Sequence, residues 1–217
     1  VCSAGFMTIT VSAVEKIEGS EVTWSFDYTS KTLTFSGKGN IPDYDTYEDE
    51  NGKSTIPWAG CAYNTVEFGK EITGIGNYAL RKSSDLVAVT IPETIKKIGN
   101  GAFSNSLVLK SVTVKNGVTE ISDGAFMGCT ALSTVELPTG ITRIGKNAFY
   151  KCTALKAITI PDSVKTIDIS AFNTCTSLET FTAPKSLETI SDRAFYCCEM
   201  LKNVTYGDKL TSIGIRA

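Results

Sequence analysis

The sequence contains no histidine among its 217 residues. No imidazole is therefore available to activate a cysteine thiol as a nucleophile. The chain also has no excess of charge, because 21 basic residues are matched by 23 acidic ones and the net charge is −2. Such a balance provides no basic surface for nucleic acid or for an anionic membrane. We therefore expect no nucleic-acid partner.

Long apolar runs are absent as well. No stretch approaches the roughly 20 apolar residues that cross a bilayer, so we expect no membrane insertion. The first 13 residues, VCSAGFMTITVSA, have two interpretations. Val11 and Ala13 suit the end of a signal peptide, whereas the alternation of apolar residues with threonine and serine suits a strand, which we favour. Because the chain opens on Val1 without a basic segment, we expect its natural start to lie upstream.

The sequence does have a pattern that recurs every 23 residues. An Ala-Phe pair runs through the chain at this spacing, and four cysteines occupy one position of the same repeat. A fixed period of this size indicates a solenoid, in which each repeat, here called a coil, packs only on its neighbours. No coil is stable alone, so we expect the phenylalanines to lie over one another as a continuous spine. The two sets are Phe103, Phe126, Phe149, Phe172 and Phe195, and Cys129, Cys152, Cys175 and Cys198.

Within one coil the pattern predicts three elements. Residues 135–137 alternate as a strand, and Pro138 ends its ladder because proline has no N–H. Residues 141–144 predict a bend or second short strand, and the apolar residues of 148–155 follow at helical spacing. The predicted fold class is therefore α/β, a right-handed solenoid of 23-residue coils with stacked parallel strands.

Written as LxxVxIPxxVxxIGxxAFxxCxx, the repeat is almost intact in LKAITIPDSVKTIDISAFNTCTS at residues 155–177. It resembles the BspA-like leucine-rich repeat family of bacterial surface proteins. The resemblance covers residues 56–217, about seven coils of which the last is incomplete. It implies a leucine-rich repeat solenoid with a parallel β-sheet on its concave face. It further implies a non-catalytic, secreted or cell-surface protein that takes part in adhesion, with a host or extracellular-matrix protein among its expected partners.

Residues 1–55 look like the module that often precedes these repeats. Alternating apolar residues at 22–26 and 33–35 flank a polar YTSK turn and predict a β-hairpin with one apolar side, which Trp58 should join. We expect this module to cap the open end of the first coil. An independent binding role for the hairpin is the alternative.

The outward positions of the predicted strands form two columns rich in threonine. The resemblance makes this face the expected contact surface, although threonine also suits any exposed strand. Because the columns hold no arginine or aromatic residue, we expect a weak or multivalent contact with a polysaccharide or an extended protein. A passive spacer is the alternative. The candidate partner-binding residues are Thr65, Glu67, Thr90, Ser111, Thr113, Thr134, Glu136, Thr159, Thr180, Thr182, Asn203 and Thr205.

No catalytic, cofactor or metal site is expected elsewhere. The four repeated cysteines should be free, packed thiols, because stacking holds their Cβ atoms too far apart for unstrained disulfides. Cys197 should face outward, and a bond between Cys2 and Cys61 is an alternative for the remaining pair. The acidic run 43–50 reads as a solvated loop, with a calcium loop as the weaker alternative because Glu48 stands where glycine is needed.

The last coil stops at Ala217, before the phenylalanine of its repeat. An uncovered solenoid end exposes an apolar layer. We therefore expect either that the natural chain continues or that a second copy covers this end by self-association.

Overall fold

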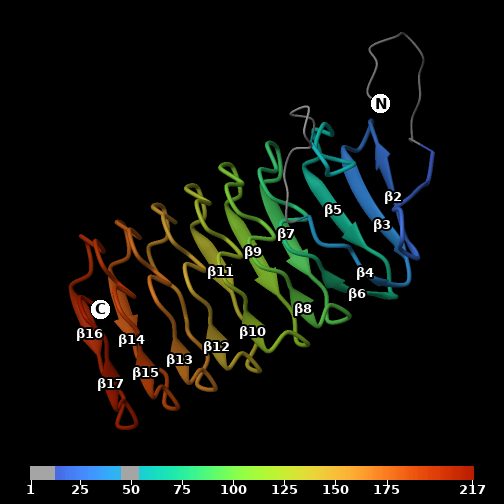
Figure 1. The fold of residues 1–217 in the computed structure, drawn as a ribbon. Coiled ribbons are helices and arrows are strands. Elements are labelled where there is room, and N and C mark those ends of the chain that lie inside the picture. The colour runs from blue at the N-terminus through green and yellow to red at the C-terminus, as the bar shows by residue number, and fades with distance from the viewer. Residues whose placement is uncertain (1–12, 45–53) are drawn as a thin grey trace.

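A computed structural model describes residues 13–44 and 54–217. These residues form a parallel-strand solenoid of about six turns, with the N-terminal strands at one end and β16 and β17 at the other (Figure 1). We call the two rows of strands along the stack the front and back rows. The N-terminal strands are β1 (Glu15–Lys16), β2 (Val22–Asp27), β3 (Thr32–Gly37) and β4 (Gly39–Asn40). The front strands are β5 (Thr65–Phe68), β7 (Ala88–Ile91), β9 (Ser111–Val114), β11 (Thr134–Glu136), β14 (Thr180–Thr182) and β16 (Asn203–Thr205). The back strands are β6 (Ile72–Ile75), β8 (Lys97–Ile98), β10 (Glu120–Ile121), β12 (Arg143–Ile144), β13 (Thr166–Ile167), β15 (Thr189–Ile190) and β17 (Ser212–Ile213).

The core is built from like residues stacked from coil to coil. In the back row, Ile144 of β12 pairs with Ile167 of β13, so the partners are 23 positions apart. The phenylalanine spine runs parallel to these ladders, from Phe103 to Phe195. Its successive ring centroids lie 5.5, 5.6, 5.2 and 5.3 Å apart, and the planes of neighbouring rings differ by 13° or less. The predicted spine is confirmed.

The α part of the predicted fold class is wrong, because the described residues contain no helix. The expected helical segment 148–155 forms a series of turns instead. The N–H groups of Asn147, Phe149 and Lys151 donate to carbonyl groups of the next coil, at 3.0, 2.8 and 2.9 Å, and so cannot bond within a helix. Asn147 and Lys151 also have φ angles of 55° and 60°, which a right-handed helix excludes. Contact between coils thus overrides the helical spacing of the side chains.

The front row does not form one continuous sheet. Its strands fall into three blocks, β1-β2-β3-β5, β7-β9-β11 and β14-β16, and the back row into two, β4-β6-β8 and β10-β12-β13-β15-β17. Between β11 and β14, residues 157–160 form no strand, and their backbone groups make no hydrogen bond within the described part of the chain.

Three consecutive prolines accompany this break. In the intact block, the N–H of Lys115 extends the ladder by donating to the carbonyl of Ile91 at 2.9 Å. The equivalent positions of the next three coils are Pro138, Pro161 and Pro184, which have no N–H to donate. The coil at 157–160 therefore lacks this bond on both of its sides.

The N-terminal hairpin is joined to the first coil through backbone pairing. β3 lies parallel to β5, with Leu33 opposite Val66, and β4 lies parallel to β6. Trp58 is fully buried against Trp24 and Phe35 at centroid distances of 5.9 and 4.8 Å, as predicted from the sequence. The strand expected at residues 9–13 lies almost entirely outside the described residues.

The spine predicts a large cost for removing one ring. We expect Phe149→Ala to lower the free energy of unfolding by about 3–5 kcal/mol, because Phe149 is fully buried between Phe126 and Phe172. The exposed Tyr196→Ala is the control and should change it by less than about 0.5 kcal/mol. Chemical denaturation, monitored by circular dichroism, measures the free energy of unfolding of both variants. A loss below about 1 kcal/mol for Phe149→Ala would contradict the stacked core.

The left-handed corners predict a stabilising substitution. Thr174 has a φ of 62°, at the position that Gly128 occupies two coils earlier with a φ of 73°. A β-branched side chain is strained in this conformation, so we expect Thr174→Gly to raise the free energy of unfolding by about 0.5–1 kcal/mol. Thr176→Gly, in the same turn, should lower it, because Thr176 is not among the residues with positive φ. Equal effects of the two variants would refute the strain at Thr174.

Candidate partner-binding face

The middle front block presents part of the predicted face as two aligned rows. Thr90 of β7, Thr113 of β9 and Glu136 of β11 lie opposite one another in the ladder. The hydroxyl of Thr113 donates to Glu136 Oε2 at 3.2 Å. Ser111 and Thr134 are aligned in the neighbouring row. Because inward residues such as Val112 are buried, these polar side chains all point away from the core.

The remaining candidate residues lie in other blocks. Thr180 faces Asn203, and Thr182 faces Thr205, across the β14–β16 ladder, and all four are exposed. Thr65 and Glu67 lie on β5, which belongs to the first block. The front face is therefore divided at two places, between β5 and β7 and between β11 and β14. Thr159, expected in the middle of a strand, lies in the segment without ladder bonds.

The structure adds two residues that the sequence analysis missed. Thr32 and Thr34 of β3 lie opposite Thr65 and Glu67 and continue both rows onto the hairpin. Their spacing from these partners is 33 residues, so a search at the repeat period does not find them. The alternation of threonine with buried Leu33 and Phe35 marks them as outward-facing. Only the parallel pairing of β3 with β5 places them on this face.

Three of the four repeated cysteines are fully buried, and Cys198 is half-buried. The thiols of Cys129, Cys152 and Cys175 are fully buried and donate to carbonyl oxygens of the spine phenylalanines at 3.1–3.3 Å. Burial raises the pKa of Cys129 to about 12, and it raises the pKa values of Cys152 and Cys175 as well. They therefore remain thiols at neutral pH, and a thiol is a poor nucleophile. Cys197 is exposed, as predicted.

The other predicted alternatives fall largely outside the described residues. Cys2 lies there, and with it the suggested bond to Cys61. Of the acidic run 43–50, the structure describes Asp43 and Tyr44, and the rest of the run lies outside the described residues. Asp43 Oδ1 accepts the N–H of Asn77 at 2.7 Å. Within residues 13–44 and 54–217, no group of three potential metal ligands comes together.

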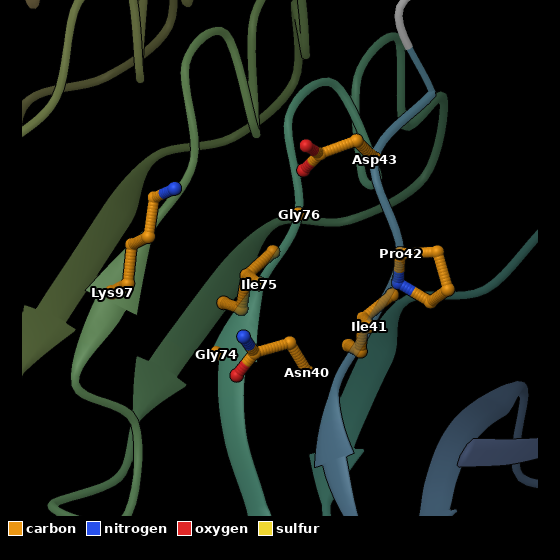
Figure 2. Close-up of a pocket in the computed structure, with 8 residues that line it drawn as sticks. All are labelled: Asn40, Ile41, Pro42, Asp43, Gly74, Ile75, Gly76 and Lys97. Carbon is orange, nitrogen blue, oxygen red and sulfur yellow. The ribbon is translucent and has the colours of Figure 1, made fainter. Parts of the chain in front are cut away.

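A hollow of about 210 Å³ beside β4 is the second place where polar groups gather (Figure 2). Asn40 and Asp43 line it from one side and Lys97 of β8 from the other. Both acceptors already have donors, because Thr73 Oγ1 donates to Asn40 Oδ1 at 2.9 Å and Asp43 binds the N–H of Asn77. A Cβ atom at Gly74 would lie 2.6 Å from Asn40 Oδ1, so glycine allows β4 to approach β6. These contacts account for the hollow as local packing.

A family comparison identifies the repeat. The model of the BspA-type leucine-rich repeat region matches residues 57–163 and 96–217, with six copies. The chain belongs to this family. No curated protein matches the chain.

Two crystal structures of leucine-rich repeat proteins share the fold of this BspA-type protein. One, from Eubacterium ventriosum, has a TM-score of 0.66 and 21% identity, covering 87% of this chain and 50% of its own. The other, from Bacteroides ovatus, has a TM-score of 0.53 and 24% identity, covering 90% of this chain and 54% of its own. This chain thus spans about half the length of either protein.

The BspA-type family is typically one of bacterial surface proteins and is generally non-catalytic. Neither the family nor the two structures indicates an enzyme. The membership therefore points to a protein-binding or structural module. Within the described residues, we find no helix of the length and apolarity needed to span a bilayer.

Thiol burial predicts the order of chemical labelling. In the folded protein, we expect a thiol reagent to modify exposed Cys197 rapidly, while Cys129, Cys152 and Cys175 react only after unfolding. Mass spectrometry of the labelled peptides measures each rate. The Cys197→Ser variant should lose the rapid reaction at position 197. Cys129, Cys152 and Cys175 should remain as protected in this variant as in the parent protein. Rapid labelling of the three buried thiols in the folded state would show that the coils are not packed as described.

Proposed function

We propose that this protein is a secreted or cell-surface recognition module that contributes to adhesion through its front face. The observation that carries the proposal is the alignment of exposed hydroxyl and carboxylate side chains in register, as in Thr90, Thr113 and Glu136. Repeated side chains at the spacing of neighbouring strands suit a repetitive or extended partner. The proposed architecture is a right-handed solenoid of 23-residue coils, with this face on the concave side and residues 1–55 as the capping module.

The composition of the face favours many modest contacts over one tight anchor. None of the twelve predicted residues is an arginine or an aromatic residue, the types that dominate tight interfaces. Each hydroxyl contributes about 1 kcal/mol when it forms a net hydrogen bond. Affinity would then come from repetition along the stack. A polysaccharide or an extended segment of a host or extracellular-matrix protein fits this requirement.

A passive spacer within a longer surface protein is the second candidate. The observation in its favour is that threonine is a good residue for any exposed strand, whether or not it binds a partner.

Self-association is a further proposal for the last coil. There Val204, Tyr206 and Ile213 expose 40%, 61% and 56% of their surface, and a second copy would cover them.

A charge substitution tests the proposed face. We expect the triple variant Thr113→Lys, Thr159→Lys and Thr182→Lys to lose attachment to immobilised matrix proteins or polysaccharides by ten-fold or more, because three large cations replace small hydroxyls. The matched control carries Thr142→Lys, Thr166→Lys and Thr189→Lys, which add the same charge just before β12 and within β13 and β15 of the back row. Surface plasmon resonance measures attachment, and equal denaturation midpoints establish equal folding. Unchanged attachment of the front variant would favour the spacer.

A further inference from the structure

The break in the front row contains a groove of about 340 Å³. It lies between residues 157–160 and the following coil, and we define it by Ile158, Thr159, Thr180, Thr182, Ala183 and Pro184. Its volume falls within the usual range of small-ligand pockets, roughly 300–1,000 Å³. The groove opens on the proposed contact face, because Thr159, Thr180 and Thr182 are all exposed.

Hydrogen-bonding groups gather in the groove from two sources. Residues 157–160 form no hydrogen bond within the described chain, so their N–H and C=O groups are available to a ligand or to water. The hydroxyls of Thr159, Thr180 and Thr182 lie along the same opening. In the intact block, by contrast, the ladders of β9 with β7 and with β11 occupy the backbone groups around Thr113. The groove is thus a place on the face where both donors and acceptors remain open.

The rest of the lining is apolar or neutralised. Ile158 and Ala183 are half-buried, and Pro184 is buried. The one charged group is Asp162, which Lys185 contacts at 2.8 Å. The side-chain hydrogen bond from Lys185 also lowers the pKa of Asp162. Because Asp162 is paired with Lys185, the lining offers no free charge that would attract a cationic or an anionic ligand.

We propose that this groove binds a sugar unit of a neutral polysaccharide, an inference that rests on the proposed binding role of the front face. Each sugar hydroxyl both donates and accepts, which matches the mixture of backbone N–H, C=O and threonine hydroxyl groups. The C–H surface of a sugar ring matches the exposed part of Ile158, which is half-buried. A neutral sugar requires no charge partner, as the paired Asp162 and Lys185 allow.

An extended polypeptide fits the groove less well. A peptide strand would need to enter between the two coils and pair with both edges. Hydrogen bonds at both ends of the groove hold the coils at adjacent spacing, from the Glu179 N–H to the Lys156 carbonyl at 3.0 Å and from the Ser186 N–H to the Asp162 carbonyl at 3.2 Å. A sugar that lies in the opening leaves both bonds intact.

Isothermal titration with neutral oligosaccharides of glucose, galactose, mannose and N-acetylglucosamine tests the assignment. We expect at least one of them to bind, and Thr180→Val and Thr182→Val each to weaken its binding about five-fold through loss of one hydroxyl. Thr119→Val is the matched control, since it removes an exposed hydroxyl next to β10 in the back row, outside the proposed face, and binding should not change. Equal denaturation midpoints establish that all variants are folded.

A second variant tests the origin of the groove. Pro184→Ala restores an N–H beside the Ile160 carbonyl, as Lys115 supplies one to Ile91 in the intact block. We expect it to extend the ladder and to weaken oligosaccharide binding. Hydrogen exchange should then show slower exchange of the residue 184 amide than of the open amides at 157–160.

Two outcomes would overturn the sugar site. One is that no neutral oligosaccharide binds. The other is that Thr119→Val weakens binding as much as Thr182→Val does. If an extended peptide or matrix protein binds instead and the triple lysine variant abolishes that binding, the proposed face stands and the groove assignment fails. If neither class of partner binds, the proposed function fails as well.

Discussion

Hydrogen bonding between neighbouring coils is the constraint on which this structure depends. Backbone N–H groups of each coil donate to the coil before or after it, both in the strands and at the turns, as with Phe149 and the Ala171 carbonyl at 2.8 Å. Side chains take part at the corners, where Asp123 Oδ1 accepts the N–H of Lys146 at 3.0 Å. The same repeat stacks Phe103 to Phe195 and buries the thiols of Cys129, Cys152 and Cys175. Local preferences yield wherever they conflict with this arrangement.

The turns show such a conflict most clearly. Side chains around residues 148–155 have helical spacing, yet alternate amides bond to the next coil and two positions per coil take positive φ. Glycine suits one of these positions at Gly128, whereas Thr174 and Cys197 accept strain at the same place. The strain persists because a right-handed conformation would aim these amides away from the neighbouring carbonyls. Stacking thus sets the backbone, and the residue type adapts to it.

Where the constraint is interrupted, the surface changes character. Pro138, Pro161 and Pro184 withhold three N–H groups in succession, and the coil at 157–160 leaves the ladder although the back row continues past it. The outward face is therefore divided into blocks with different chemistry. At the central strand β9 only side chains are open to a partner, whereas at residues 157–160 the backbone is open too. A repetitive sequence can in this way carry one distinctive site on an otherwise uniform face.

The sequence by itself determined the repeat, its family, the phenylalanine spine, the buried thiols and the outward position of most candidate residues. These follow from periodicity, because like positions of a stacked repeat share one environment. Only the tertiary structure decided that the turns are not helical, that the front sheet is broken at Thr159, and that Thr32 and Thr34 extend the face. Each of these depends on which coil supplies a hydrogen-bond partner. That information lies in the distance between chain segments in space, and no local pattern of residues contains it.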